Sequence, residues 1–340
     1  MKPLRFFLFP LAGLYGFFVW IRNRLFDWRI FSAASYDLPL IGIGNLSTGG
    51  TGKSVVVDYL LHHFHDSFLL ATLSRGYGRK TKGVRIGSDS DTAATLGDEP
   101  FQYLVKYPSI QVGVAESRVE GVQRLLAQQP PPQAILLDDV FQHRWVQPSL
   151  SILTTTYDDP FSKDFLLPVG NLREHSSERK RADIVLITKT PAEATASDRS
   201  RLLQSLKLKA NQKSYFCALS YSKQLAGNQS LSWEKFKKRP FVLVTGIANT
   251  TPLTRYLKAE KACFDHLEFP DHYTYTPRAL KKIIQKAAGH PILTTEKDYG
   301  RLAPVLAERI PLFYLAVTLC FVNKEEEVQF LNQIEHVLGV

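Results

Sequence analysis

A glycine-rich segment that ends in Lys-Ser carries the strongest chemical signal in the sequence. Residues 47–54 read STGGTGKS, directly after a strand candidate that ends at residue 44 and directly before a helix candidate. The glycines allow backbone N–H groups to point into a concavity, Lys53 can reach the β- and γ-phosphates of a nucleotide, and the Ser54 hydroxyl suits Mg²⁺. The segment therefore predicts a phosphate-binding loop, although Ser47 stands where the usual pattern has its first glycine. Its predicted ligand-binding residues are Ser47, Thr48, Gly49, Gly50, Thr51, Gly52, Lys53 and Ser54.

Two adjacent acids follow an uncharged run at residues 134–139, which read AILLDD. Nucleotide chemistry needs a carboxylate that orients the metal at the end of a buried strand. Because neighbouring residues of a strand point to opposite faces, one of Asp138 and Asp139 should meet Mg²⁺ and its water shell while the other orients a loop or a second ligand. The residues alone leave open which of the two contacts the metal.

Arginines and acids between these motifs could hold a phosphate and accept a proton. Residues 74–79, SRGYGR, place two arginines among glycines at a strand end, where guanidinium groups can bind an oxyanion bidentately. Residues 97–100, GDEP, place Asp98 and Glu99 on a turn at a helix start, where a proton acceptor could lie close to the γ-phosphate. Acids before a helix most often only cap it, so GDEP alone is a weak signal.

Short apolar runs that alternate with helical stretches carry these motifs. Strand candidates are residues 38–44, 68–73, 111–114, 134–137, 150–153 and 183–187, and helix candidates between them are residues 53–64, 100–106 and 118–128. This order predicts a mostly parallel α/β sheet with helices on both faces, of the kind found in P-loop NTPases. After a polar stretch at 220–233 the alternation resumes at 241–245, 253–258, 263–269, 278–288, 292–295, 312–317 and a final helix at 324–338. It predicts a second, smaller α/β domain.

The N-terminal segment is apolar, aromatic-rich and flanked by basic residues. Residues 6–21 read FFLFPLAGLYGFFVWI, with Lys2 and Arg5 before them and Arg22 and Arg24 after them. The run lacks a small-residue cleavage site, which argues against a signal peptide, and it is shorter than a usual spanning helix. A helix that lies in a membrane interface fits best, and a first helix buried in a soluble core is the alternative.

Composition narrows the class of protein and its partners. The chain has 340 residues, 44% of them hydrophobic and 22% charged, which excludes a disordered or fibrous chain and suggests about two domains. Its three cysteines lie far apart, so neither a disulfide framework nor a thiolate zinc site is expected. A formal net charge of +10 favours an anionic partner, such as a phosphorylated substrate or an acidic membrane face. No nucleic-acid-binding motif supports a nucleic-acid partner.

Seven motifs in order along nearly the whole chain resemble the tetraacyldisaccharide 4'-kinase family of lipid A synthesis. They are GNLSTGGTGKS at 44–54, SRGYGR at 74–79, GDEP at 97–100, DDVFQH at 138–143, LLPVGNLRE at 166–174, FPDHY at 269–273 and TTEKD at 294–298. The sequence departs from the family pattern at Val140, where glycine is usual, at Asn171, and at Ser54, where threonine is commoner. Serine can ligate Mg²⁺ as threonine does, whereas a β-branched residue at 140 resists a positive φ.

The resemblance implies a function and a set of site residues. Such kinases transfer the γ-phosphoryl group of ATP to the 4'-hydroxyl of a tetraacylated disaccharide 1-phosphate at the cytoplasmic face of the bacterial inner membrane. Motif matching implies that Asp98 is the base, assisted by His272. It also implies phosphate and Mg²⁺ binding by Lys53 and Ser54. Asp138 and Asp139, and with them Glu99, would organise the metal. Less certain active-site supports are Arg75, Glu99, Arg118, Arg173 and Glu174.

The expected organisation is a membrane-associating helix at residues 1–25, a P-loop kinase domain at 26–220 and a smaller α/β domain at 221–340 that closes over the nucleotide. The rival hypothesis is a membrane-associated P-loop NTPase that acts as a regulatory switch. A GTPase should carry an N/T-K-x-D motif, and the nearest candidate, at residues 188–191, lacks the Asp. Acyl-chain preference, oligomeric state and whether the first helix spans the bilayer are left open.

Overall fold

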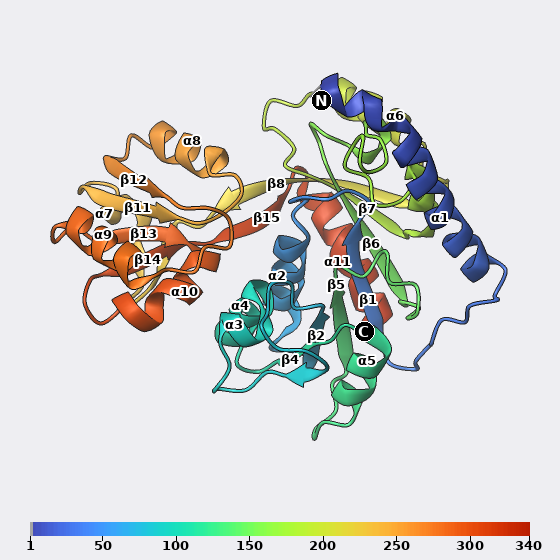
Figure 1. The fold of residues 1–340 in the computed structure, drawn as a ribbon, viewed down its shortest axis with the longest axis horizontal. Helices are drawn as coiled ribbons and strands as arrows, with labels where there is room; N and C mark the ends of the chain where they lie inside the picture. The colour runs from blue at the N-terminus through green and yellow to red at the C-terminus, as the bar shows by residue number, and fades with distance from the viewer. Residues whose placement is uncertain (1–2) are drawn as a thin grey trace.

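Two separate β-sheets organise the chain in the computed structural model, which describes residues 3–340 (Figure 1). Within these residues the larger sheet has nine strands in the order β15-β8-β7-β6-β1-β5-β2-β4-β3. The smaller sheet has six strands in the order β10-β9-β14-β13-β11-β12. Figure 1 shows the two sheets side by side, with the smaller one at the left. This arrangement agrees with the predicted α/β fold with a second, smaller α/β domain.

The strands of the larger sheet are mostly parallel and buried on both faces. Because both faces are covered, β1, β2, β5 and β7 read as continuous apolar runs in the sequence. Among the described strands of the larger sheet, only the edge pairs β3–β4 and β15–β8 are antiparallel. The strands are β1 (Leu40–Asn45), β2 (Leu70–Ser74), β3 (Arg85–Ile86), β4 (Gln111–Val114), β5 (Ala134–Asp138), β6 (Leu150–Thr156), β7 (Ile184–Thr188), β8 (Lys213–Tyr221) and β15 (Val317–Phe321).

Helices cover both faces of the larger sheet. Side chains of α2, α4 and α11, such as Val56, Tyr103 and Phe330, share one core with Ile41 of β1. Side chains of α5 and α6 pack in two cores with Leu73 of β2 and with β7. The helices of this domain are α2 (Lys53–Phe64), α3 (Ala93–Leu96), α4 (Asp98–Lys106), α5 (Arg118–Leu126), α6 (Ala196–Leu206) and α11 (Lys324–Leu338), with the 3-10 helices η2 (Phe161–Lys163) and η3 (Ser176–Arg181).

The smaller domain surrounds its own sheet with its own cores. Leu243 of β11 packs with Trp233 and Leu257 on one side, and Val244 packs with Ile283 and Leu302 on the other. Its strands are β9 (Gln224–Gly227), β10 (Leu231–Ser232), β11 (Phe241–Thr245), β12 (Phe264–Glu268), β13 (Ile292–Thr295) and β14 (Leu312–Leu315), and its helices are α7 (Trp233–Phe236), α8 (Thr251–Ala259), α9 (Pro277–Ala287) and α10 (Glu296–Leu306).

The end of the chain returns to the larger domain, which differs from the predicted range 221–340 for the smaller domain. β15 pairs with β8 from Val317↔Tyr221 to Phe321↔Cys217. Phe321, and Phe330 of α11, join the core that also contains Tyr59 of α2. Figure 1 shows the red α11 among the blue and green elements of the larger domain. The reason is that the apolar run at 312–317 divides between two sheets, which periodicity cannot reveal.

The N-terminal helix lies along the outside of the larger domain (Figure 1). The 3-10 helix η1 (Pro3–Leu8) leads into α1 (Phe9–Asp27), and Ala12, Asn23 and Phe26 of α1 are buried. The membrane-associating helix is predicted at residues 1–25. Its first two residues, which include Lys2, lie outside the described residues, and so does the side chain of Phe6. Of the helices in residues 3–340, none combines the length and apolarity needed to cross a bilayer.

Candidate active site

The predicted phosphate-binding loop lies between β1 and α2, as the sequence order requires. Gly49 has φ +118° and Gly52 has φ +86°, conformations that glycine adopts without strain. A Cβ atom added at Gly49 or Gly50 would meet no heavy atom within 4 Å, so the tip of the loop is open. The loop therefore has the exposed backbone and the helix N-terminus that phosphate binding needs.

Side chains from neighbouring strands hold the base of the loop. Asn45 Nδ2 donates to Thr51 Oγ1 at 2.9 Å, and the Thr51 hydroxyl lies 2.7 Å from the Thr154 hydroxyl. Thr188 Oγ1 donates to the Thr51 carbonyl at 2.8 Å, and Lys189 Nζ donates to the Gly50 carbonyl at 2.6 Å. Thr188 and Lys189 belong to the segment that was the nearest candidate for a guanine motif. In the structure they bind main-chain carbonyls of the phosphate-binding loop.

A second segment of the chain forms one wall of the loop. Ser47 makes an isolated antiparallel bridge with Leu172. The Thr48 backbone N–H donates to the Asn171 carbonyl at 2.7 Å, and the Thr48 hydroxyl lies 3.3 Å from the same oxygen. Ser47 and Thr48 are thus tied to the loop that carries the LLPVGNLRE motif.

Lys53, Asp139 and Arg173 form one charged cluster beside the loop. Lys53 Nζ lies 3.4 Å from Asp139 Oδ1, and Arg173 binds both Asp139 oxygens, at 2.8 and 3.1 Å. Burial alone raises the pKa of Asp139, but Arg173 and Lys53 outweigh it and lower the pKa to about 2. Asp139 has φ +50°, so the left-handed residue of this turn is Asp139 and Val140 replaces glycine without strain. The cluster therefore places two basic side chains and one carboxylate beside the loop.

Asp138 is buried next to this cluster and differs from Asp139. No group of residues 3–340 donates a hydrogen bond to its carboxylate. Burial raises the pKa of Asp138 to about 6, with Lys53 opposing the rise and Glu99 and Asp139 adding to it. A buried carboxylate without a hydrogen-bond donor among the described residues is a natural position for a bound cation.

Arg118 binds the main-chain carbonyl of Asp138 and so helps to fix its position. Its side chain is buried, Nη1 donates to the Ala115 carbonyl at 2.6 Å, and Nη2 donates to the Asp138 carbonyl at 3.2 Å. Burial lowers the pKa of Arg118 to about 10, against the opposing charge of Asp138. Arg118 therefore fixes the end of β5.

Asp98 and His272 meet across the two domains. Asp98 Oδ2 lies 2.6 Å from His272 Nδ1, and Arg301 Nε donates to Asp98 Oδ1 at 2.8 Å. Arg301 Nη2 also bonds Asp98 Oδ2. Burial alone raises the pKa of Asp98, but Arg301 and His272 lower it below its ordinary value. The Tyr77 ring lies 5.8 Å from the His272 ring and covers one side of the pair.

Glu99 also pairs across the domains. Its carboxylate bonds Lys297 Nζ of α10. Burial alone raises the pKa of Glu99, but Lys297 lowers it. Lys106 Nζ lies 2.7 Å from Asp58 and 3.2 Å from Glu296, so α4 is bonded to both domains. These pairs hold the smaller domain against the start of α4.

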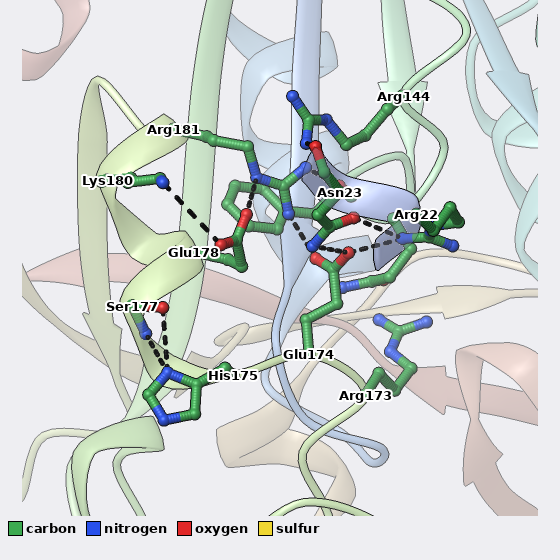
Figure 2. A network of polar contacts seen from close by, with 12 residues as sticks. Arg22, Asn23, Arg144, Arg173, Glu174, His175, Ser177, Glu178, Lys180 and Arg181 are labelled. Atoms are coloured by element: carbon green, nitrogen blue, oxygen red, sulfur yellow. Dashed lines mark hydrogen bonds and ion pairs between the residues drawn. The ribbon is translucent and has the colours of Figure 1, made fainter. Parts of the chain in front are cut away.

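Two residues predicted to support the active site, Arg75 and Glu174, do not join the charged clusters described above. Arg75 is exposed at the end of β2 and makes no hydrogen bond within residues 3–340. Glu174 is fully buried away from the loop, where it binds Arg22, Asn23 and Arg181 (Figure 2). Glu174 thus joins α1 to the larger domain.

Comparison with known proteins decides the family. The family described as Tetraacyldisaccharide-1-P 4'-kinase matches residues 4–336. The chain belongs to this family. A Tetraacyldisaccharide 4'-kinase of Flavobacterium johnsoniae is 41% identical over 343 residues, covering 99% of both chains. One of Phocaeicola vulgatus is 36% identical over 345 residues, covering 97% of this chain and 94% of its own.

A solved structure supports the same family. The chain is similar to LpxK from Aquifex aeolicus, solved in complex with ATP, with a TM-score of 0.79 and 28% identity. The match covers 98% of this chain and 99% of that one. The resemblance to the tetraacyldisaccharide 4'-kinase family and the predicted α/β fold are thereby confirmed.

Sequence reasoning missed several residues of this 4'-kinase site. Arg301 and Lys297 contact the GDEP acids, and Asn45 accepts from Arg173. A signal existed for Lys297, because it lies in the TTEKD motif at a helix start. Arg301 follows four residues later on the same helix face. Asn45 lies in the motif at 44–54, just before the predicted loop, and this was its signal.

Proposed function

We propose that this chain transfers the γ-phosphoryl group of ATP to the 4'-hydroxyl of a tetraacyldisaccharide 1-phosphate. The observation that carries the proposal is the meeting of Asp98 and His272, 2.6 Å apart, beside an open phosphate-binding loop in a member of this family. A phosphoryl-transfer site needs phosphate binding, charge neutralisation and one proton acceptor. The arrangement supplies a residue for each requirement.

Residues 47–54 would hold the β- and γ-phosphates of ATP. The backbone of Gly49 and Gly50 is open, and Lys53 is bound only loosely by Asp139, at 3.4 Å. Lys53 can therefore turn to the phosphates while Arg173 keeps Asp139 in place. As the bond between the bridging oxygen and the γ-phosphorus breaks and the bond to the 4'-oxygen forms, Lys53 neutralises the charge on the phosphate oxygens and ADP leaves.

The residues present also fit a magnesium ion. Mg²⁺ in phosphoryl-transfer sites is bound by one or two carboxylates, a hydroxyl, substrate phosphates and water. Asp138 is a buried carboxylate with no hydrogen bond from the described residues, and Ser54 lies at the start of α2. No group of three or more His, Cys, Asp or Glu residues that could hold a metal by itself occurs in residues 3–340, in agreement with a site that shares its ion with phosphates. When bound, Mg²⁺ would neutralise charge on the phosphates.

Asp98 would accept the proton of the 4'-hydroxyl. Because Arg301 and His272 lower the pKa of Asp98 despite its burial, the carboxylate is ionised and ready to accept at neutral pH. The imidazole of His272 is in direct contact and assists by orienting the Asp98 carboxylate, or by receiving its proton in the tautomer that leaves Nδ1 free. Glu99 is neutralised by Lys297, which suits a supporting role better than metal binding.

The lipid substrate requires contact with a membrane. Four acyl chains do not leave a bilayer readily, at about 0.8 kcal/mol for each exposed CH₂ group. Helix α1 exposes Leu11, Leu14, Phe17, Phe18 and Trp20. We place this surface on the cytoplasmic face of the inner membrane, where ATP is available and a positively charged chain meets anionic lipid.

One assay separates the kinase from the regulatory NTPase. The full chain is incubated with Mg²⁺ and either ATP or GTP, with and without tetraacyldisaccharide 1-phosphate in mixed micelles. The proposal predicts phosphate transfer to the lipid with ATP and little nucleotide hydrolysis without the lipid. Nucleotide hydrolysis that prefers GTP and ignores the lipid would support the regulatory switch and reject the kinase.

A further inference from the structure

The segment at residues 165–174 contacts helix α1 at one end and the phosphate-binding loop at the other. The Phe165 ring packs edge-on against Phe9, with centroids 5.7 Å apart. A Cβ atom on Gly16 would lie 2.7 Å from Leu166, so α1 and this segment touch closely. At the far end Asn171 accepts from the Thr48 backbone. One short piece of chain therefore spans from the proposed membrane helix to the proposed nucleotide site.

Arg173 and Glu174 are adjacent in sequence, but Arg173 contacts residues at the phosphate-binding loop and Glu174 contacts α1. Arg173 binds Asp139 and Asn45 at the phosphate-binding loop. Glu174 binds Arg22 at 2.6 Å and Asn23 at 3.1 Å, both on α1. Figure 2 shows the Glu174 carboxylate among Arg22, Asn23 and Arg181, with the Arg173 guanidinium outside that group. A displacement of α1 would therefore act directly on the residue next to Arg173.

Helix α1 also holds the backbone of Arg173 itself. The Tyr15 hydroxyl donates to the Arg173 carbonyl at 2.7 Å. Tyr15 and Arg22 are two helical turns apart, so they share the inward face of α1. The side chains of Leu11, Leu14 and Phe18 are exposed. Tyr15, Arg22 and Asn23 of α1 thus contact Arg173 and Glu174, while Leu11, Leu14 and Phe18 face solvent.

We propose that Tyr15 and Glu174 are positioning residues that couple the seating of α1 on an anionic lipid bilayer to nucleotide binding at residues 47–54. This inference rests on the proposed function, because it takes α1 as the membrane-contacting element. It adds that the bilayer strengthens nucleotide binding, and that the contacts of Arg173 carry the effect.

We call α1 docked when Arg22 and Asn23 bond Glu174. Because Glu174 is buried, the docked helix is one defined state rather than one of many intermediate positions. A fully buried carboxylate that loses Arg22 and Asn23 is left partly uncompensated, so intermediate positions of α1 are unfavourable. Only the docked helix presents its apolar side chains outward while Arg22 and Asn23 face protein. A bilayer therefore binds the docked state better, which is the differential affinity that coupling requires. Coupling is reciprocal, so nucleotide must strengthen bilayer binding by the same factor.

The test uses the full chain, the non-hydrolysable analogue AMP-PNP with Mg²⁺, and vesicles of phosphatidylethanolamine and phosphatidylglycerol. The dissociation constant of AMP-PNP is measured with and without vesicles, and vesicle binding is measured by sedimentation with and without AMP-PNP. The wild-type chain should bind AMP-PNP roughly fivefold or more tightly with vesicles. Sedimentation should show an equal gain in vesicle binding with AMP-PNP.

Tyr15→Phe is the deciding variant, because Glu174→Gln removes the buried charge that pairs with Arg22 and Arg181 and can fail to fold. Tyr15→Phe should bind AMP-PNP normally without vesicles, bind vesicles, and lose most of the vesicle effect. Tyr36→Phe is the matched control, since the Tyr36 hydroxyl donates to the Val119 carbonyl, away from α1. It should keep the full effect.

Two results would overturn the coupling. One is an unchanged AMP-PNP dissociation constant in a wild-type chain that sediments with vesicles, and the other is a full vesicle effect in Tyr15→Phe. Either result leaves the proposed kinase standing if phosphate transfer to the lipid persists. A wild-type chain that neither binds AMP-PNP nor transfers phosphate would reject both.

Discussion

Asp98 Oδ2 and His272 Nδ1 lie 2.6 Å apart although 174 positions separate the two residues in the chain. The contact exists because α10 brings Arg301 and Lys297 onto the first two residues of α4. The proposed base is therefore held by residues of both domains. A change in how the smaller domain docks should alter the pKa and the position of Asp98.

Arg301 should set the acid limit of activity. Arg301 and His272 lower the pKa of Asp98 against its burial, so Asp98 stays ionised well into the acid range. In Arg301→Gln that pKa rises, the carboxylate takes up a proton at a higher pH, and kcat should fall more at pH 5.5 than at pH 8. A pH profile of kcat measures the shift. Arg255→Gln, on the exposed face of α8, should leave the profile unchanged.

Lys53 should be essential for transfer. Removing a charge-stabilising group at a phosphoryl-transfer centre commonly costs about 10²-fold or more in rate. Lys53→Ala should therefore lose at least that factor in kcat/KM with ATP, and Lys235→Ala, an exposed lysine on α7, should lose none. Steady-state transfer assays compare the two. A Lys53→Ala enzyme within threefold of wild type would remove Lys53 from the phosphate site.

Glu174 should contribute strongly to stability. Removing one partner of a buried ion pair typically destabilises a protein by about 3–5 kcal/mol, and Glu174 is fully buried with Arg22 and Arg181. Glu174→Ala should lower the free energy of unfolding by that order. Glu193→Ala, an exposed glutamate in a loop, should change it by less than about 0.5 kcal/mol. Urea unfolding measures both, and equal stabilities would contradict the anchoring role.

The exposed apolar surface of α1 should bind lipid. Leu14 and Phe18 are 55% and 63% exposed, one helical turn apart. Because burying a large apolar side chain is worth about 1.5–3 kcal/mol, replacing both by serine should weaken partition into anionic vesicles by roughly tenfold or more. Sedimentation with vesicles measures the change. Replacing Val305 and Val328, exposed on other helices, is the matched control and should have no effect.

Local signals predicted elements of both domains, among them the helix that follows the phosphate-binding loop. The helix predicted at 53–64 coincides with α2 (Lys53–Phe64), and the strand at 241–245 coincides with β11 (Phe241–Thr245). β11 is buried throughout, and α2 buries seven of its 12 residues. The missed elements have weaker patterns. Within α6 only Leu202 and Leu206 are buried, and β8 buries only three of its nine residues. The spacing of apolar residues reflects which positions are buried, so helices and strands that bury few side chains are hard to predict from the sequence.

Contacts between distant segments were beyond sequence reasoning. The motif acids were predicted as site residues, but the 203 positions between Arg301 and Asp98 hid their pairing. Glu174 was predicted as an active-site support because it follows Arg173 in a motif. Its partner Arg22 lies 152 positions away on α1, so the anchoring contact emerged only from the fold.

The most direct measurement of the central claim is the position of the transferred phosphate. The full chain is incubated with Mg²⁺, ATP labelled in its γ-phosphate and saturating tetraacyldisaccharide 1-phosphate, beside an Asp98→Ala chain. We expect label on the 4'-oxygen of the lipid from the wild-type chain. In Asp98→Ala we expect the transfer rate to fall by about 10²-fold or more. Label found only in free phosphate, or near-normal transfer by Asp98→Ala, would contradict the central claim.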